Sequence, residues 1–194
     1  MDQAVRSAPL TRRDWLEAGQ TLLRKRGVAG LKLRPLAASL GISTGSFYHH
    51  FADFETFLAE LARYYSGEQL AEHLRVVRAE ASTPYERIVR ASQIAHEVVL
   101  SELIAAMRAW ARRDPAVAVE VDALEQGLQA FLAECFADLG FSADEAKVRA
   151  FVLLSAASGG VTPPELTDGK GALGRLIIEM ACAGASNGRP VQQF

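Results

Sequence analysis

Apolar side chains recur along this chain with the three- and four-residue spacing of one helix face. Phe54, Phe57, Leu58, Leu61 and Tyr65 stand at i, i+3, i+4, i+7 and i+11 of one such stripe. No sustained two-residue alternation of the kind that marks a β-strand accompanies these stripes. The sequence therefore predicts an all-α protein. A chain of 194 residues forms one large domain or two small ones and needs no disulfide or metal to complete its core.

The charge is unevenly distributed along the chain. The whole sequence has 21 Lys and Arg against 23 Asp and Glu. Up to Tyr65, however, nine basic residues stand against six acidic ones, a net charge of +3, whereas the remainder has a net charge of −5. This asymmetry predicts that only the N-terminal part of the chain binds a polyanion.

Several classes of protein are disfavoured. No stretch approaches the roughly 18 consecutive apolar residues of a membrane span, and the polar start of the chain lacks the apolar core of a signal peptide. Cys135 and Cys182 both lie in apolar stretches of helical pattern, which fits a cytoplasmic protein with reduced, buried thiols. The sequence has no metal-ligand spacing, phosphate-binding loop or nucleophile elbow, so we expect no metal, no cofactor and no enzyme.

The first two helices have recognisable ends. Thr11 and Asp14 fit the start of a helix that ends at Gly27, after three basic residues at positions 24–26. A short second helix is expected over about Leu33–Leu40, with a proline in its first turn, where the missing N–H does no harm.

The residues that follow predict a helix-turn-helix between Leu33 and Phe51. Gly41 is expected in the left-handed conformation at the turn, Ile42 in the core and Ser43 at the start of a helix of about two turns. Phe47 faces the core, and the outward residues of the third helix are short, polar or aromatic, as groove-reading surfaces require. These outward residues are Thr44, Gly45, Ser46, Tyr48, His49 and His50.

The run GLKLRPLAASLGISTGSFYHHFADFETFLAEL, from Gly30 to Leu61, resembles the DNA-binding domain of TetR-family transcriptional regulators. With the first helix, the resemblance covers roughly residues 10 to 60. It implies an N-terminal three-helix DNA-binding domain over residues 1–53, with a flexible tail over 1–9, and a larger helical ligand-binding and dimerisation domain over 54–194.

The resemblance also implies DNA contacts for individual residues. Arg34 matches a position that contacts a base or a phosphate, and His49 matches the most variable base-reading position. The other matching positions lie near base edges or phosphates: Lys32, Ser43, Thr44, Gly45, Ser46, Tyr48 and His50. The chain departs from the family pattern at Lys32 and Leu33, where Thr or Ser is usual, and at Phe54, where Lys is usual.

The rest of the chain predicts further helices. They are expected from Pro84 to about Leu100, from Ser101 to Arg113 and from Pro115 to about Leu139. The last two cover Ala143–Ala157, after a capping box at Ser142 and Glu145, and about Ala172–Ala183. In TetR-like proteins the last two long helices form a four-helix bundle with those of a second subunit. The residues implied in such a homodimer interface are Phe151, Leu154, Ala157, Leu173, Leu176, Ile177 and Met180.

A second set of residues lies on the helices that line the ligand cavity of the family. These residues are His96, Met107, Trp110, Phe131, Cys135 and Phe136. They suit a lipophilic or aromatic small molecule. The same residues could instead simply fill the core, and a buried histidine such as His96 is more often a satisfied core residue than a ligand contact.

The resulting hypothesis is a homodimeric repressor that binds a pseudo-palindromic operator in double-stranded DNA and is released by a small molecule. One alternative is an activator, or a regulator that responds to a partner protein. The other is a helical carrier or enzyme that has lost DNA binding. The sequence does not identify the effector, the operator, the target genes or the sign of regulation.

Overall fold

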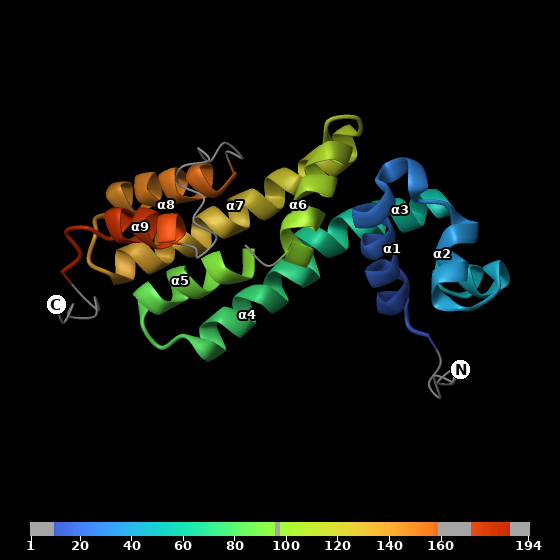
Figure 1. Cartoon of the computed structure of the whole chain (residues 1–194), viewed down its shortest axis with the longest axis horizontal. Helices are drawn as coiled ribbons and strands as arrows, with labels where there is room; N and C mark the ends of the chain where they lie inside the picture. The colour runs from blue at the N-terminus through green and yellow to red at the C-terminus, as the bar shows by residue number, and fades with distance from the viewer. Residues whose placement is uncertain (1–9, 96–97, 159–171, 187–194) are drawn as a thin grey trace. The chain divides into compact units, whose positions relative to one another are not determined.

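The computed structural model of the chain describes residues 10–95, 98–158 and 172–186. Within these ranges every regular element is helical, and no strand occurs, so the predicted all-α class is confirmed. The elements shown in Figure 1 are α1 (Arg12–Arg26), η1 (Val28–Gly30), α2 (Leu33–Leu40), η2 (Thr44–His49), α3 (Phe54–Tyr64), η3 (Tyr65–Gln69), α4 (Leu70–Glu80), α5 (Pro84–Ala95), α6 (Val98–Ala111), α7 (Pro115–Asp138), α8 (Ala143–Ser158) and α9 (Ala172–Ala181). None of the helices in the described ranges has the length and apolar character needed to cross a bilayer.

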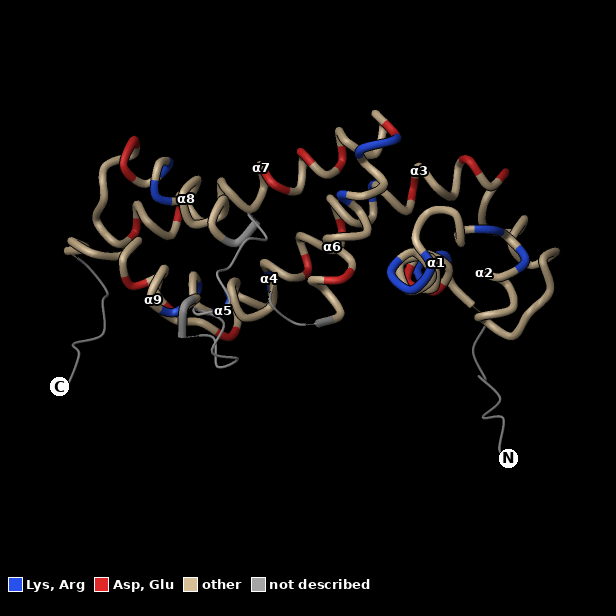
Figure 2. The backbone as a smooth tube through the Cα atoms, turned by 45° about the horizontal axis from the view of Figure 1, so that its top comes forward, with Lys and Arg blue, Asp and Glu red and all other residues tan. Residues whose placement is uncertain are grey.

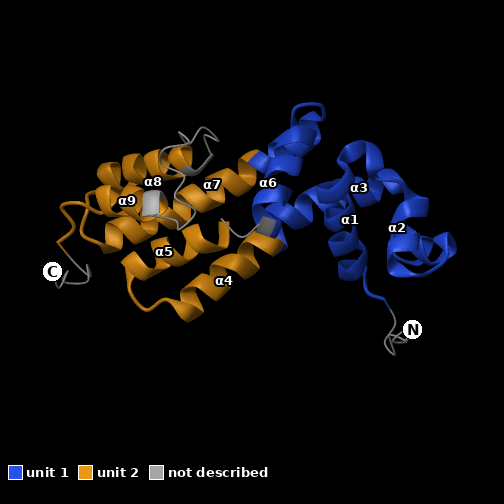
Figure 3. Ribbon diagram, viewed as in Figure 1, with its two compact units in different colours: residues 1–68, 98–121 blue, residues 69–97, 122–194 orange. Residues whose placement is uncertain are grey.

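The chain divides into two compact units, which Figure 3 shows in different colours. Unit 1 contains Met1–Glu68 and Val98–Val121, and unit 2 contains Gln69–Glu97 and Asp122–Phe194. Unit 1 therefore joins the segment predicted to bind DNA to α3, α6 and the start of α7. The functional division at residues 53 and 54 stays a prediction, as does the flexible tail over 1–9, which lies outside the described residues.

Helix α1 begins and ends as its sequence predicts. The Thr11 hydroxyl accepts the Asp14 backbone N–H at 3.3 Å, and the Asp14 carboxylate accepts the Thr11 N–H at 2.8 Å, which completes the capping box. Gly27 ends the helix at φ 63° and donates its N–H to the Leu23 carbonyl at 2.7 Å. In unit 1, α1 packs against α2, α3 and α6.

Glycine is needed at the contact between α1 and α3. A Cβ atom at Gly19 would lie 2.7 Å from Cζ of Phe57, closer than real carbon contacts allow. The two helices are also joined by an ion pair between Arg12 and Glu60, and Arg24 on α1 lies 3.5 Å from Glu102 on α6. Packing and ion pairs thus hold α1 against both α3 and α6 within unit 1.

The apolar stripe from Phe54 to Tyr65 lies on a long helix that begins after Asp53 and has one interruption. The Asp53 carboxylate accepts the backbone N–H of Thr56 at 2.7 Å, and this hydrogen bond lowers the pKa of Asp53. Helix α3 passes into a π-helical turn, η3, before α4 continues. In η3 the Ser66 hydroxyl donates a hydrogen bond to the Glu120 carboxylate of α7.

Unit 2 is a packed set of helices in which α4 contacts α5, and α9 contacts both α5 and α8. Its fully buried side chains include Val77, Ile88, Phe136 and Leu139. The predicted capping box of α8 is confirmed, because the Glu145 carboxylate accepts from the Ser142 backbone N–H and hydroxyl. These contacts hold the pKa of Glu145 below its ordinary value.

Four predicted helix boundaries differ from those of the structure. Residues 98–100, which were predicted in the helix from Pro84, belong to α6, whose described residues start at Val98 rather than Ser101. Helix α6 ends at Ala111, because the Arg113 N–H bonds to the Trp110 carbonyl at 2.9 Å in a tight turn. Helix α9 ends at Ala181, where a turn leads to Gly184 at φ 86°.

Candidate nucleic-acid interface

The turn after α2 has the geometry that its sequence predicts. Gly41 adopts the left-handed conformation, with φ 72° and ψ 27°. Its N–H bonds to the Ala38 carbonyl, and the Ile42 N–H bonds to the Ala37 carbonyl, both at 3.2 Å. This pair of bonds is a Schellman motif, which caps α2 and reverses the chain into the next segment.

The next segment, Thr44–His49, is the recognition segment, and it is a 3₁₀-helix rather than the predicted α-helix of about two turns. The Ser46 N–H bonds to the Ser43 carbonyl at 3.2 Å, and the His50 N–H bonds to the Phe47 carbonyl at 2.9 Å. Ser43 stands at the start of the segment, as predicted, although its side chain makes no capping hydrogen bond. Six residues give few i→i+4 bonds, so a short 3₁₀ segment held by packing takes their place.

Packing beneath the recognition segment is aromatic. Phe47 is fully buried, as predicted, and lies 5.3 Å from the Trp15 ring, 5.1 Å from Phe51 and 5.7 Å from Phe57, measured between centroids. Phe54, which stands where the family usually has Lys, lies 6.0 Å from Phe47. The departure at position 54 therefore adds an aromatic ring to the support of the segment.

The outward side chains of the segment differ in exposure. Tyr48 is 61% exposed, and His49 is also exposed. Thr44, Ser46 and His50 are half-buried, and the His50 ring lies 6.3 Å from that of Trp15. Ile42, predicted in the core, is only half-buried because it lies at the turn.

Gly45 has no steric reason to be glycine within the fold. It is exposed, and a Cβ atom there would meet only the Ser43 hydroxyl, at 3.7 Å. Its φ is not among the positive values found in the described residues. Because Gly45 has no side chain, another molecule could approach the backbone at the start of the recognition segment closely.

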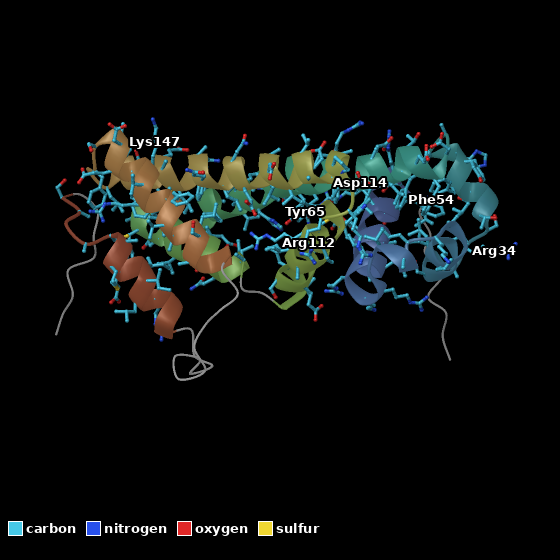
Figure 4. All side chains as sticks on the ribbon, turned by 90° about the horizontal axis from the view of Figure 1, so that it is seen from above. Arg34, Phe54, Tyr65, Arg112, Asp114 and Lys147 are labelled. Carbon is cyan, nitrogen blue, oxygen red and sulfur yellow. The ribbon has the colours of Figure 1, made fainter. Side chains whose placement is uncertain are left out.

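The sequence around the recognition segment is basic. Between Glu17 and Asp53 the sequence has no acidic residue, but it has Arg24, Lys25, Arg26, Lys32 and Arg34. Figure 2 shows the basic positions at α2 and the acidic ones that follow on α3. Lys32 and Arg34 are both exposed, and Figure 4 shows the Arg34 side chain extending outward from α2.

This arrangement differs from that of the basic residues at the start of α1. Arg12 is paired with Glu60, and Arg13 with Glu17 at 2.8 Å. The hydrogen bonds to these carboxylates raise the pKa of both guanidinium groups. The unneutralised positive charge of unit 1 thus includes Lys32 and Arg34, beside the recognition segment.

The structure distributes the predicted cavity residues over both units. Met107 and Trp110 are buried on α6 in unit 1, whereas Phe131, Cys135 and Phe136 are buried on α7 in unit 2. His96 lies outside the described residues. Trp110 lines a pocket of about 320 Å³ in unit 1. Across the described ranges, no three His, Cys, Asp or Glu side chains gather as metal ligands would.

The predicted dimer residues lie on α8 and α9, which pack side by side in unit 2 (Figure 1). Phe151, Leu176 and Met180 are exposed, and Leu154 and Ile177 are half-buried. The side chain of Ala157 and that of Leu173 lie outside the described set. Val148 and Val152 of α8, which the sequence analysis did not include, are also exposed. Val148 and Val152 are four residues apart, and Val148 is three residues before Phe151, a helical spacing by which the sequence could have indicated them.

Residues 16–61 match the sequence profile described as bacterial regulatory proteins, tetR family. Over 88 residues the chain is 32% identical to the HTH-type transcriptional repressor KstR2 of Mycobacterium tuberculosis, a match that covers 45% of this chain and 44% of that repressor. The chain thus matches less than half the length of this relative.

Solved structures share the fold over most of the chain. A TetR transcriptional regulator from Legionella pneumophila has a TM-score of 0.70 at 16% identity and covers 90% of this chain and 97% of its own. The transcriptional regulator FadR from Bacillus subtilis, solved in complex with stearoyl-CoA, has a TM-score of 0.62 at 15% identity. The match covers 90% of this chain and 99% of the FadR chain. The helix-turn-helix built from α2 and the recognition segment therefore lies within a segment, residues 16–61, that is similar to the bacterial regulatory proteins of the tetR family.

Proposed function

We propose that the protein is a homodimeric, cytoplasmic transcriptional repressor that binds operator DNA and is released by a small-molecule effector. The observation that carries this proposal is the recognition segment. A polar, partly exposed surface with Tyr48 outermost lies on the buried ring of Phe47, beside the exposed cations Lys32 and Arg34. Such a surface suits a groove lined by phosphates.

Each outward residue has a role in the proposed complex. Arg34 reaches a guanine edge or a phosphate, and Lys32 and Ser43 contact phosphates. Thr44, Gly45 and Ser46 approach base edges and the backbone, because their side chains are short. Tyr48 and His50 contact phosphates, and His49 reads a variable base.

A homodimer is proposed because α8 and α9 expose a large apolar surface. Phe151 is 59% exposed and Met180 is 67% exposed. Large apolar side chains gathered on one surface mark an interaction site, and a two-fold symmetric pairing covers the same surface on both copies. Two recognition segments would then reach half-sites separated by about one helical turn, roughly 34–36 Å.

Release by an effector follows from linkage between two sites. A small molecule lowers DNA affinity only to the extent that it binds the DNA-free state more tightly than the DNA-bound state. FadR of Bacillus subtilis was solved with stearoyl-CoA, which shows that this fold accommodates a ligand in that protein.

The direct test is a band-shift titration with DNA from the upstream region of the gene that encodes this protein. We expect wild-type protein to retard the fragment, and Arg34→Ala to bind it more weakly by about 1–3 kcal/mol. Arg113→Ala is the matched control, since Arg113 is an exposed arginine of unit 1 in the turn after α6. Absence of retardation by folded dimer, or equal effects of the two variants, would contradict the proposal and favour a carrier or enzyme.

A further inference from the structure

A pocket of about 320 Å³ lies within unit 1, between α3 and the turn that joins α6 to α7. We propose that this pocket binds a lipophilic organic cation, and that its occupation changes DNA binding through α3. The effect of this pocket on DNA binding rests on the function proposed above.

The floor of the pocket is apolar. Leu58 and Ala62 come from α3, Trp110 from the last turn of α6 and Val117 from the first turn of α7. Ala62, Trp110 and Val117 are almost fully buried, so the floor is continuous with the core of unit 1. The volume falls at the lower end of the range for drug-sized ligands, which is about 300–1,000 Å³.

The rim of the pocket is acidic. Glu55, Asp114 and Glu120 contribute three carboxylates to the lining, whereas Arg63 is the single basic residue in it. Two of the carboxylates are fixed by hydrogen bonds. Asp114 accepts the backbone N–H groups of Ala116 at 3.0 Å and Val117 at 3.4 Å. Glu120 accepts the Ser66 hydroxyl.

The combination of floor and rim selects the chemical class of the ligand. An apolar floor with a surplus of carboxylates favours a molecule with apolar bulk and positive charge, and it disfavours an anion of the same shape. The indole of Trp110 adds a surface that attracts cations. Neutral lipophilic molecules would make the apolar contacts with the floor but would lack the electrostatic attraction to the carboxylates of the rim.

One helix connects this pocket to the recognition segment. On α3, Leu58 and Ala62 line the pocket, while Phe54 and Phe57 lie 6.0 and 5.7 Å from the buried Phe47 ring. Phe47 is the core anchor of the recognition segment. Because cores are close-packed, a ligand that displaces α3 also displaces the support of that segment.

The binding step is tested without DNA. Equilibrium dialysis of the full chain with tetraphenylphosphonium, and in parallel with tetraphenylborate, compares a cation and an anion of the same shape. We expect the cation to bind with one site per chain and the anion not to bind. The double variant Glu55→Gln/Glu120→Gln is expected to weaken cation binding by about fivefold to tenfold. Asp144→Asn, an exposed carboxylate at the start of α8, is the control expected to leave it unchanged.

A second variant tests the location sterically. Ala59 is an exposed residue of the lining, so Ala59→Trp fills the pocket without disturbing the core. We expect it to abolish cation binding. Equal binding of the two probes, no cation binding, or binding that survives Ala59→Trp would overturn the assignment of the pocket.

The coupling is tested by adding tetraphenylphosphonium to the band-shift titration. We expect the wild-type complex to weaken as the cation is added, and the complex of Ala59→Trp to be unaffected. Cation binding without any change in DNA affinity would overturn the coupling alone. If the protein bound the cation in dialysis but no DNA at all, the proposed function and the coupling would fail, and the pocket would stand.

Discussion

The ring of Phe47 lies edge-on against that of Trp15, with 5.3 Å between the centroids and 80° between the planes. Phe47 belongs to the recognition segment and Trp15 to the first turn of α1, and both side chains are fully buried. The contact therefore joins the recognition segment to the helix that packs against α2, α3 and α6. A groove-reading surface needs this fixed support, because each of its contacts is short.

Phe47→Ala is expected to destabilise the protein by about 3–5 kcal/mol, the usual cost of truncating a buried Phe to Ala. The substitution removes the ring on which Trp15, Phe51 and Phe57 converge. Urea unfolding followed by far-ultraviolet circular dichroism measures the change. Val119→Ala, at an exposed position of α7, is expected to stay within about 0.5 kcal/mol of wild type. Similar midpoints for the two variants would contradict the role of the aromatic cluster.

Gly45→Leu is expected to leave the folded structure intact and to weaken DNA binding. The position is exposed, and a Cβ atom there meets only one distant hydroxyl, so the fold accommodates a side chain. In the complex the same side chain would lie between the recognition segment and the DNA. Thermal unfolding and band-shift titration of the same sample separate the two effects, with Gly45→Ala as the smaller step. Unchanged DNA affinity for Gly45→Leu would place the interface elsewhere.

Asp53 is expected to stabilise the start of α3 in a pH-dependent manner. The hydrogen bond from the Thr56 N–H lowers the pKa of Asp53 below its ordinary value of 3.8. The stabilisation is thus fully present above the unfolded-state pKa and is lost as the pH falls through the lower pKa of the folded state. Asp53→Asn keeps an acceptor oxygen but does not titrate. The free energy of unfolding of wild type relative to Asp53→Asn should therefore fall between neutral pH and the acid range. A difference that stays constant with pH would exclude this role.

Cys135 is expected to resist alkylation in the folded protein. Its thiol is buried on α7, and burial raises its pKa to about 12. Because the thiolate is the reactive form, iodoacetamide at pH 8 should leave Cys135 unmodified until the protein is unfolded. Mass spectrometry of native and urea-treated samples measures the modification. Rapid labelling of the native protein would show that this part of unit 2 opens readily.

The parts of the fold that depend on local chemistry could be predicted from the sequence. Thr11 and Asp14 form the predicted capping box, and Gly41 adopts the predicted left-handed conformation. Phe47 is buried as its position in the pattern indicates. In each case a few neighbouring residues determine the result, so no knowledge of distant contacts was needed.

The remaining features depend on contacts between distant segments. The 3₁₀ geometry of residues 44–49 follows from how Phe47 packs, and the role of Phe54 follows from its distance to Phe47. The pocket of unit 1 brings α3 together with the turn before Pro115, more than forty residues later in the chain. The DNA, dimer and effector contacts of individual residues stay predictions.

The most direct measurement of the central claim is the salt dependence of binding to the upstream DNA fragment, for wild type and for Lys32→Ala. Release of counterions from phosphates makes the logarithm of the affinity fall linearly with the logarithm of the salt concentration. We predict a steep slope for wild type, and a slope reduced by about one for Lys32→Ala, which removes one phosphate contact. An affinity independent of salt, or identical slopes for the two proteins, would contradict DNA binding by this surface.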